Sequence, residues 1–205
     1  MRRALLVIVL ILAPAGPAAA MPAVDQEPRA APASRAIGKP YAGRLIDGVQ
    51  FPAEGFDFVT WDPIRRRTPN RAWRRWATQQ VIDSTLFVLR EYRDAHPGAP
   101  RVLVGDLSRA GGGPFGPRYG GLGHASHQNG LDVDVYYPRR DGRSIEAALP
   151  GEVDPRLAQD LVDRFVEAGA VKIYTGPNLR LRGPRRVVQK LVHHDDHLHV
   201  RFRTE

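Results

Sequence analysis

Histidines and aspartates gather in two short segments of this chain. The first, GHASHQNGLDVDVYY at 123–137, contains His124, His127, Asp132 and Asp134. The second is HHDDHLHVRF at 193–202. Together the two segments contain six of the seven histidines of the chain. Neutral imidazole and carboxylate are good zinc ligands, and three of them plus a water form the open arrangement of a catalytic zinc. Taken alone, the second segment fits a solvated charged edge or an adventitious metal-binding tract equally well. Together, the two segments predict a zinc site.

Strand alternation predicts which of these side chains meet. Successive residues of a strand point to opposite faces. In LDVDVYY, Asp132 and Asp134 therefore share a polar face, and in HLHVRF the same holds for His197 and His199. If the two strands are neighbours, Asp134 and His199 project on the same side, and the turn that follows His127 can fold it back over the strand. We therefore predict His127, Asp134 and His199 as zinc ligands.

Hydrolysis also requires a group that moves protons. His197 is the main candidate, because it lies two residues from His199 on the same strand face. His194 is a second candidate, which could orient or stabilise the intermediate. A bound zinc would lower the pKa of its water to about 7 and polarise the scissile carbonyl. Asp132 is expected to be a structural acid beside the site and not a ligand.

The elements that must position these residues can be predicted from apolar periodicity and from Gly and Pro signals. Strands are expected within 43–52, 56–61, 101–106, 171–175 and 197–202, a long helix at 70–96, a helix from Pro155 to Gly169 and a short helix at 184–192. Trp73 and Trp76 are expected to pack in or on the long helix and not to form a substrate platform. Strands without regular strand–helix alternation indicate an α+β domain with a mainly antiparallel sheet.

The glycine-rich segment 107–123 is predicted to be one wall of a substrate groove. The strands on either side of it must both end near the metal, so the loop that joins them passes the site. Its glycines would let backbone amides approach an extended peptide closely. Arg109 and Arg118 are then expected to face substrate carboxylates. The segment lacks the GxxxxGK[ST] order of a phosphate-binding loop.

The N-terminal residues indicate export. Arg2 and Arg3 precede a short apolar run and then small residues up to Ala20, which is the pattern of a secretory signal peptide, and no stretch is long enough for a membrane-spanning helix. We expect a signal peptide at 1–20, a flexible Pro- and Ala-rich leader at 21–37 and one domain at 38–205. The chain has no cysteine, so a packed core must stabilise it without disulfides.

These segments resemble a known family of zinc peptidases. His127-x6-Asp134 followed by His197-x-His199 resembles the signature of LAS-type peptidases, the lysostaphin, D-Ala-D-Ala carboxypeptidase and hedgehog-like group. The closer similarity is to penicillin-insensitive murein endopeptidases, over most of residues 41–203. Gly105-Asp106, the glycine-rich loop, GHASHQNGLDVDV, IYTGPNLR and the H-x2-H-x-H of 194–199 carry it.

The resemblance implies a LAS-type core, an antiparallel sheet with flanking helices. It implies that His127, Asp134 and His199 bind zinc and that His197 and His194 are the catalytic histidines. Some members of the family hold a second metal through the histidine that corresponds to His124. Here residues 138–154 contain no histidine, which argues against a second metal and leaves His124, like Asp132, beside the first. Asp196 stands where related carboxypeptidases have a catalytic Glu, so it is the alternative proton shuttle.

The sequence therefore predicts an exported zinc endopeptidase that hydrolyses peptide cross-links of peptidoglycan. A carboxypeptidase that trims stem peptides (D,D- or L,D-), and a hedgehog-like zinc domain that binds without catalysis, are the alternatives. The basic balance, a formal net charge of +8, favours an anionic surface. For an exported protein in a periplasm or cell wall, we expect this surface to be wall polymer and not nucleic acid. The cleaved bond and the oligomeric state are left open.

Overall fold

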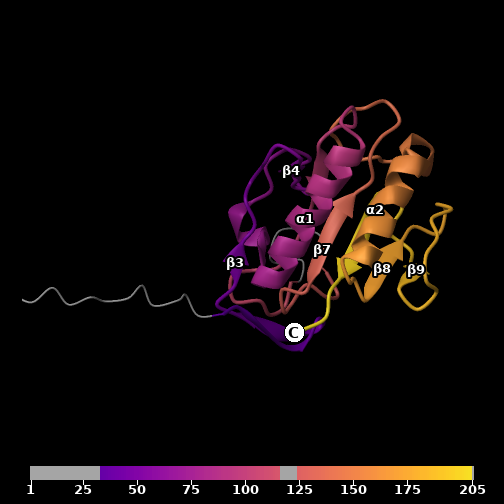
Figure 1. The fold of residues 1–205 in the computed structure, drawn as a ribbon. Coiled ribbons are helices and arrows are strands. Elements are labelled where there is room, and N and C mark those ends of the chain that lie inside the picture. Colours follow the sequence, from indigo (N-terminus) through magenta and orange to yellow (C-terminus); the bar gives the residue numbers. More distant parts are fainter. Residues whose placement is uncertain (1–32, 116–123, 205) are drawn as a thin grey trace, which may run out of the picture. The chain divides into compact units, whose positions relative to one another are not determined.

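A six-stranded sheet forms the centre of the fold in the computed structural model, which describes residues 33–115 and 124–204 (Figure 1). In sheet order its strands are β4 (Phe58–Thr60), β6 (Val102–Val104), β7 (Asp132–Tyr136), β10 (His197–Arg201), β8 (Lys172–Thr175) and β9 (Val188–Lys190). The three central pairings are antiparallel, and the two outer ones, β4–β6 and β8–β9, are parallel. The predicted α+β class with a mainly antiparallel sheet is confirmed.

Two helices, α1 (Gln79–Ala95) and α2 (Pro155–Glu167), lie side by side over one face of the sheet (Figure 1). Their buried apolar side chains join those of β7 and β10 in a single core. Each helix begins at a polar cap, since the Thr78 side chain accepts from the Val81 N–H and Asp154 accepts from two N–H groups of the first turn of α2.

The long helix predicted from residue 70 begins instead at Gln79. Residues 70–78 hold a short 3-10 helix, η1 (Ala72–Arg74), and strand β5 (Trp76–Ala77). Strand β5 pairs with β3 (Val49–Gln50). Strand pairing buries Ala77 and leaves Trp73 and Trp76 half-buried, an arrangement that the helical period did not reveal.

The predicted helix at 184–192 is also wrong, because this segment contains strand β9. Val188, Gln189 and Lys190 pair in parallel with β8, and the Ile173 N–H donates to the Val187 carbonyl. Strand preference depends on the neighbouring strand that is available, here the edge of β8, and the short local sequence does not report that edge.

The folded region begins three residues earlier than the expected domain boundary at Gly38. Strand β1 (Arg35–Lys39) pairs with β2 (Ala42–Ile46) in a separate two-stranded sheet. The predicted signal peptide at 1–20 and the leader up to residue 32 lie outside the described residues. In the part of the chain that the structure describes, none of the helices is long and apolar enough to cross a membrane.

The face of the sheet opposite the helices carries the polar side chains. On β7 and β10 the buried apolar residues Val133, Val135, Leu198 and Val200 belong to the helix-side core. The alternating residues therefore face the other way. A smaller apolar cluster of Val59, Trp61, Leu103 and Tyr136 covers part of this second face. The site described next is built on the remainder of it.

Candidate metal centre

Strands β7 and β10 are neighbours, as predicted, and their register places His199 directly opposite Asp134. The Asp134 Oδ1 atom lies 3.1 Å from His199 Nδ1 and 3.3 Å from His127 Nε2. The two imidazole nitrogens are 3.2 Å apart. Three donor atoms thus converge on one point, although the residues lie 65 and 72 positions apart in the sequence. One ion placed there could contact all three.

His127 is held in place by its backbone and by its second ring nitrogen. Its φ of +66° is rare for a residue with a side chain, and its backbone N–H donates to Asp132 Oδ2 at 2.8 Å. The Nδ1–H donates to the Leu107 carbonyl at 2.7 Å. Because a carbonyl can only accept, Nδ1 carries the proton and Nε2 keeps the lone pair that a metal requires.

Asp132 contacts both histidines whose nitrogens converge, through the His127 backbone N–H and His199 Nε2. It accepts from Arg201 through Nε at 2.6 Å and Nη2 at 3.2 Å. The Nε2 atom of His199 lies 3.4 Å from Asp132 Oδ1. Two overlapping groups could hold a metal ion, His124–His127–Asp134 and His127–Asp132–His199. The shortest mutual distances, however, join His127, Asp134 and His199, while Asp132 is engaged by Arg201.

Burial and charge set the protonation of these groups. Burial lowers the pKa of His127 below its usual value, which favours the neutral ring. Burial opposes ionisation of Asp134, but the neighbouring His127 and His197 keep its pKa well below the ordinary value. Burial likewise opposes charge on His199, but Asp132 and Asp134 raise its pKa to about 9. A metal ion that binds His199 therefore competes with a proton for Nδ1.

Two more histidines line the approach to this centre. His197 Nδ1 lies 2.7 Å from the Asp196 carboxylate, and its Nε2 lies 3.8 Å from Asp134 Oδ1. Burial opposes protonation of His197, but Asp134 and Asp196 raise its pKa. The ring of His194 lies 4.9 Å from that of His197, and its Nδ1–H donates to the Val192 carbonyl. Burial and the neighbouring His197 lower the pKa of His194.

Asp106 and Arg74 are parts of the site that residue patterns alone did not reveal. Arg74 donates to both oxygens of Asp106, and both side chains are buried. His124 Nε2 donates to Asp106 Oδ2 at 2.8 Å, and its Nδ1 lies 3.9 Å from Asp134 Oδ2. Burial raises the pKa of Asp106, but the hydrogen bonds from Arg74 and His124 outweigh this and lower it to about 2. A chain of polar contacts through Arg74, Asp106 and His124 thus leads from η1 to Asp134.

The Gly105-Asp106 pair extends the sheet beyond β6. The Gly105 N–H donates to the Asp134 carbonyl, and the Asp134 N–H donates to the Asp106 carbonyl. A Cβ on Gly105 would lie 2.8 Å from the Tyr136 ring, so a side chain there would clash. In the sequence this pair was prominent only through the family resemblance.

A pocket of about 510 Å³ opens beside the centre. Its lining residues include Asp134, His197, Asp196, Glu146 and Arg66. Arg66 was not predicted from the sequence. Its side chain is 66% exposed, and its Nη2 lies 2.7 Å from Glu146 Oε1. The Glu146 carboxylate in turn accepts from Trp61 Nε1 at 3.0 Å. One wall of the pocket thus presents an anchored arginine.

The two predicted substrate arginines stay predictions. Arg109 donates to the Pro114 carbonyl within its own loop and is not among the residues that line this pocket. Arg118 lies outside the described residues, as do residues 116–123 of the glycine-rich loop. The residues that flank 116–123, Phe115 and His124, form a β-bridge, and their rings stack with centroids 5.0 Å apart.

Comparison with known proteins gives consistent similarities. Residues 36–153 match the family model described as penicillin-insensitive murein endopeptidase. Proteins of that name from Salmonella arizonae, Yersinia enterocolitica and Klebsiella pneumoniae are 42%, 26% and 29% identical to this chain over 83, 196 and 148 residues. These matches cover 40%, 82% and 59% of this chain but 27%, 66% and 52% of the relatives. The chain thus spans no more than about two thirds of their length.

The family match and the geometry contribute different parts of the site. The matched range includes His127 and Asp134 but ends at residue 153, before His194, His197 and His199. The register of β7 and β10 brings the two segments together.

Proposed function

The chain belongs to the family of penicillin-insensitive murein endopeptidases, and we propose that it is an exported zinc peptidase that hydrolyses amide bonds in the peptide cross-links of peptidoglycan. The observation that carries this proposal is the convergence of His127 Nε2, Asp134 Oδ1 and His199 Nδ1 within 3.1–3.3 Å of one another. It lies at the edge of an open pocket.

The donor set fits zinc. Tetrahedral zinc with ligand distances of about 2.0–2.1 Å separates its ligand atoms by about 3.3 Å, close to the three separations here. All three donors are nitrogen or oxygen and come from buried residues, and one of them, Asp134, lines the adjoining pocket. When bound, zinc would polarise the scissile carbonyl and activate a water. The remaining chemistry belongs to the chain's own residues.

His197 is proposed to move the proton that the leaving amine must gain. Its Nδ1–H donates to Asp196, which favours the imidazolium form and fixes the ring, so that Nε2–H is the donor on the other side. The carboxylate of Asp196 is occupied by this hydrogen bond, which supports an orienting role for Asp196 over its alternative role as the proton shuttle. The arrangement is a general acid with its own positioning carboxylate.

His194 is proposed to assist on the same side of the centre. Because its Nδ1–H donates to the Val192 carbonyl, its Nε2 carries a lone pair in the neutral ring. That nitrogen can accept a proton, and only afterwards can it donate to developing negative charge. His124, bonded to Asp106, is proposed to support Asp134 and not to hold a second metal.

Digestion of purified peptidoglycan, with the fragments identified by mass, tests the function. An endopeptidase converts cross-linked dimers to monomers, whereas a carboxypeptidase shortens stem peptides and leaves the dimers intact. A zinc domain that only binds would release no fragment. The chelated protein and His127→Ala are the controls, and dimers that survive treatment with metal-loaded protein would contradict the proposal. Export, based on the predicted signal peptide, is tested separately by the N-terminal sequence of the mature protein.

A further inference from the structure

An arginine-rich loop lies between β8 and β9, at the edge of the sheet beside α2 (Figure 1). Residues 168–194 contain no acidic residue, but they contain six basic ones, Lys172, Arg180, Arg182, Arg185, Arg186 and Lys190. We call residues 176–187 the arginine loop. Its four arginines are exposed. This concentration of positive charge is not used by the catalytic site.

The four guanidinium groups have no partner among the described residues. None of them makes a hydrogen bond or ion pair with another residue in ranges 33–115 and 124–204. Elsewhere in the same ranges arginines pair closely with carboxylates, for example Arg71 with Asp62 and Arg164 with Asp160, each at 2.6 Å. Within those ranges the four positive charges of the arginine loop lack a partner, so they can act on an external anion.

The loop is held in a fixed shape. Leu179 and Leu181 are buried in the main core, so the intervening Arg180 and the following Arg182 are directed to solvent. The two lysines brace the backbone from either side. Lys190 Nζ donates to the Pro177 and Leu179 carbonyls, both at 2.9 Å, and Lys172 Nζ donates to the Arg186 carbonyl at 2.7 Å. The arginines therefore project from an ordered backbone, which lowers the entropy lost on binding.

One end of the loop adjoins the catalytic pocket. Asn178 donates to both oxygens of Asp195, through its backbone N–H at 3.1 Å and its Nδ2 at 2.6 Å. Asp195 is itself one of the residues that line that pocket. Arg180 follows Asn178 by two residues, so the positive surface begins at the rim of the pocket.

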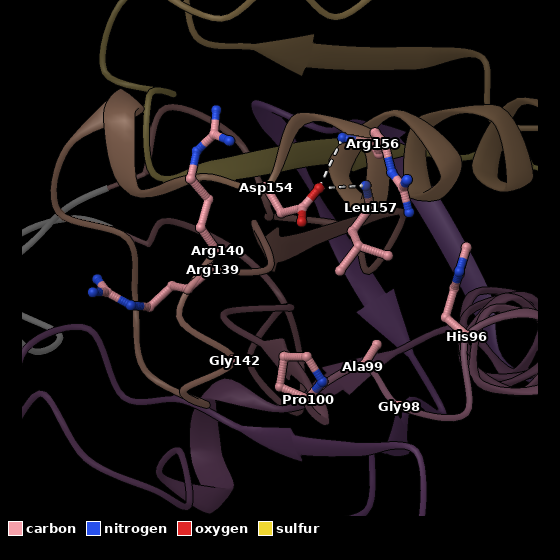
Figure 2. A pocket seen from close by; sticks show the side chains of 10 residues that line it. All are labelled: His96, Gly98, Ala99, Pro100, Arg139, Arg140, Gly142, Asp154, Arg156 and Leu157. Atoms are coloured by element: carbon pink, nitrogen blue, oxygen red, sulfur yellow. Dashed lines mark hydrogen bonds between the residues drawn. The ribbon is translucent and has the colours of Figure 1, made fainter.

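The other end continues onto α2. Arg180 and Arg182 line a hollow together with Arg156 and His96. The two carboxylates that line this hollow already have partners, because Asp160 forms an ion pair with Arg164 and Asp163 accepts a hydrogen bond from Gln159. Figure 2 shows the adjoining hollow, which shares Arg156 and His96. There the Arg156 side chain extends toward His96, while the Asp154 carboxylate accepts hydrogen bonds from the backbone N–H groups of Arg156 and Leu157 at the start of α2.

We propose that the arginine loop binds carboxylate-bearing peptides of the peptidoglycan network outside the catalytic pocket and so holds the enzyme on its insoluble substrate. The inference rests on the proposed function. Guanidinium groups bind carboxylates in a two-pronged geometry, and a network that repeats carboxylates offers several of them to a row of arginines. A second contact also raises the effective concentration of cross-links at the pocket.

The test compares two variants of equal net charge. In the first, Arg180, Arg182, Arg185 and Arg186 are replaced by Gln. In the control, the exposed Arg35, Arg90, Arg143 and Arg203, which lie outside the arginine loop, are replaced by Gln. Chelated, inactive protein is sedimented with intact sacculi over a range of salt concentrations. We expect the loop variant to bind at least about tenfold more weakly and with a smaller salt dependence, and the control variant to bind nearly as the unsubstituted protein does.

Further experiments identify the ligand and distinguish the arginine-loop proposal from the proposed function. Sacculi whose carboxylates have been converted to amides should no longer distinguish the variants. Cleavage of a short soluble cross-linked dimer should be unchanged in the loop variant, whereas release of fragments from intact sacculi should slow. Equal losses in both variants, or loop-dependent binding only to phosphatidylglycerol vesicles or to nucleic acid, would overturn the inference. Failure of the soluble dimer to be cleaved by the unsubstituted, metal-loaded protein would instead overturn the proposed function.

Discussion

Each histidine of the centre is distinguished by the partner of its second ring nitrogen. A backbone carbonyl accepts from His127 and from His194, which fixes a neutral tautomer. A carboxylate accepts from His197, which favours the charged ring. These partners supply a physical basis for treating His127 as a ligand and His197 as a proton donor, although the sequence presents both only as histidines near an Asp.

The first prediction concerns His197. His197→Ala should retain bound zinc but lower kcat by at least about a hundredfold, because a positioned acid is lost. Asp196→Asn should cost less, since it removes only the partner that orients the ring. Metal content and kcat on a soluble dimer are the measurements. Nearly full activity in His197→Ala together with an inactive Asp196→Asn would make Asp196 the shuttle.

The second prediction concerns Arg66 on the wall of the pocket. Arg66→Ala should raise KM for cross-linked peptides by about tenfold with little change in kcat, because a surface guanidinium that contacts substrate carboxylate contributes chiefly to ground-state binding. The matched control is Arg65→Ala, since Arg65 is the exposed neighbour and is not among the residues that line that pocket. Indistinguishable kinetics in the two variants would remove Arg66 from the substrate site.

At the scale of elements, the buried pair Arg74–Asp106 connects η1 to the extension of β6. Arg74→Met should lower the free energy of unfolding by about 3–5 kcal/mol, because the Asp106 carboxylate would stay buried without its main cation. The exposed pair Arg101–Glu54 is the control, and Arg101→Ala should cost about 0–1 kcal/mol. Urea unfolding measures both. Asn70 Nδ2 also donates to Asp106 Oδ1, at 2.8 Å. A similar small loss in the two variants would show that Asn70 and His124 suffice to stabilise the Asp106 carboxylate.

The elements also show what sequence patterns could and could not predict. Alternation identified β7 and β10 and their polar faces because each strand has one apolar face in the core. Periodicity located α2 and the end of α1 for the same reason. It failed at 184–192 and at the start of α1, where pairing with β8 and β3 decides the conformation. The pairing of Arg74 with Asp106 across 32 positions leaves no local periodic signal.

For the whole molecule, metal binding is expected to add to folding stability, because the donors His127, Asp134 and His199 come from two distant segments that only the fold brings together. A chelator should lower Tm by about 10 °C if zinc is present at about a thousandfold its Kd, since that ratio stabilises the folded state by about 4 kcal/mol. Added zinc should restore Tm. The double variant His127→Ala/His199→Ala should not respond to chelator or to zinc, and an equal response in that variant would place the metal elsewhere.

The position of β10 in the sheet has a consequence for biosynthesis. The last strand in sequence lies between β7 and β8, and it carries His199. Until residues 197–201 have been synthesised and released, β7 and β8 each have an open edge and the centre lacks a donor. On the proposed function, a chain whose last strand has not yet been added could not hydrolyse peptidoglycan. Because synthesis proceeds from β7 to β10, the centre is complete only after the last strand has entered the sheet.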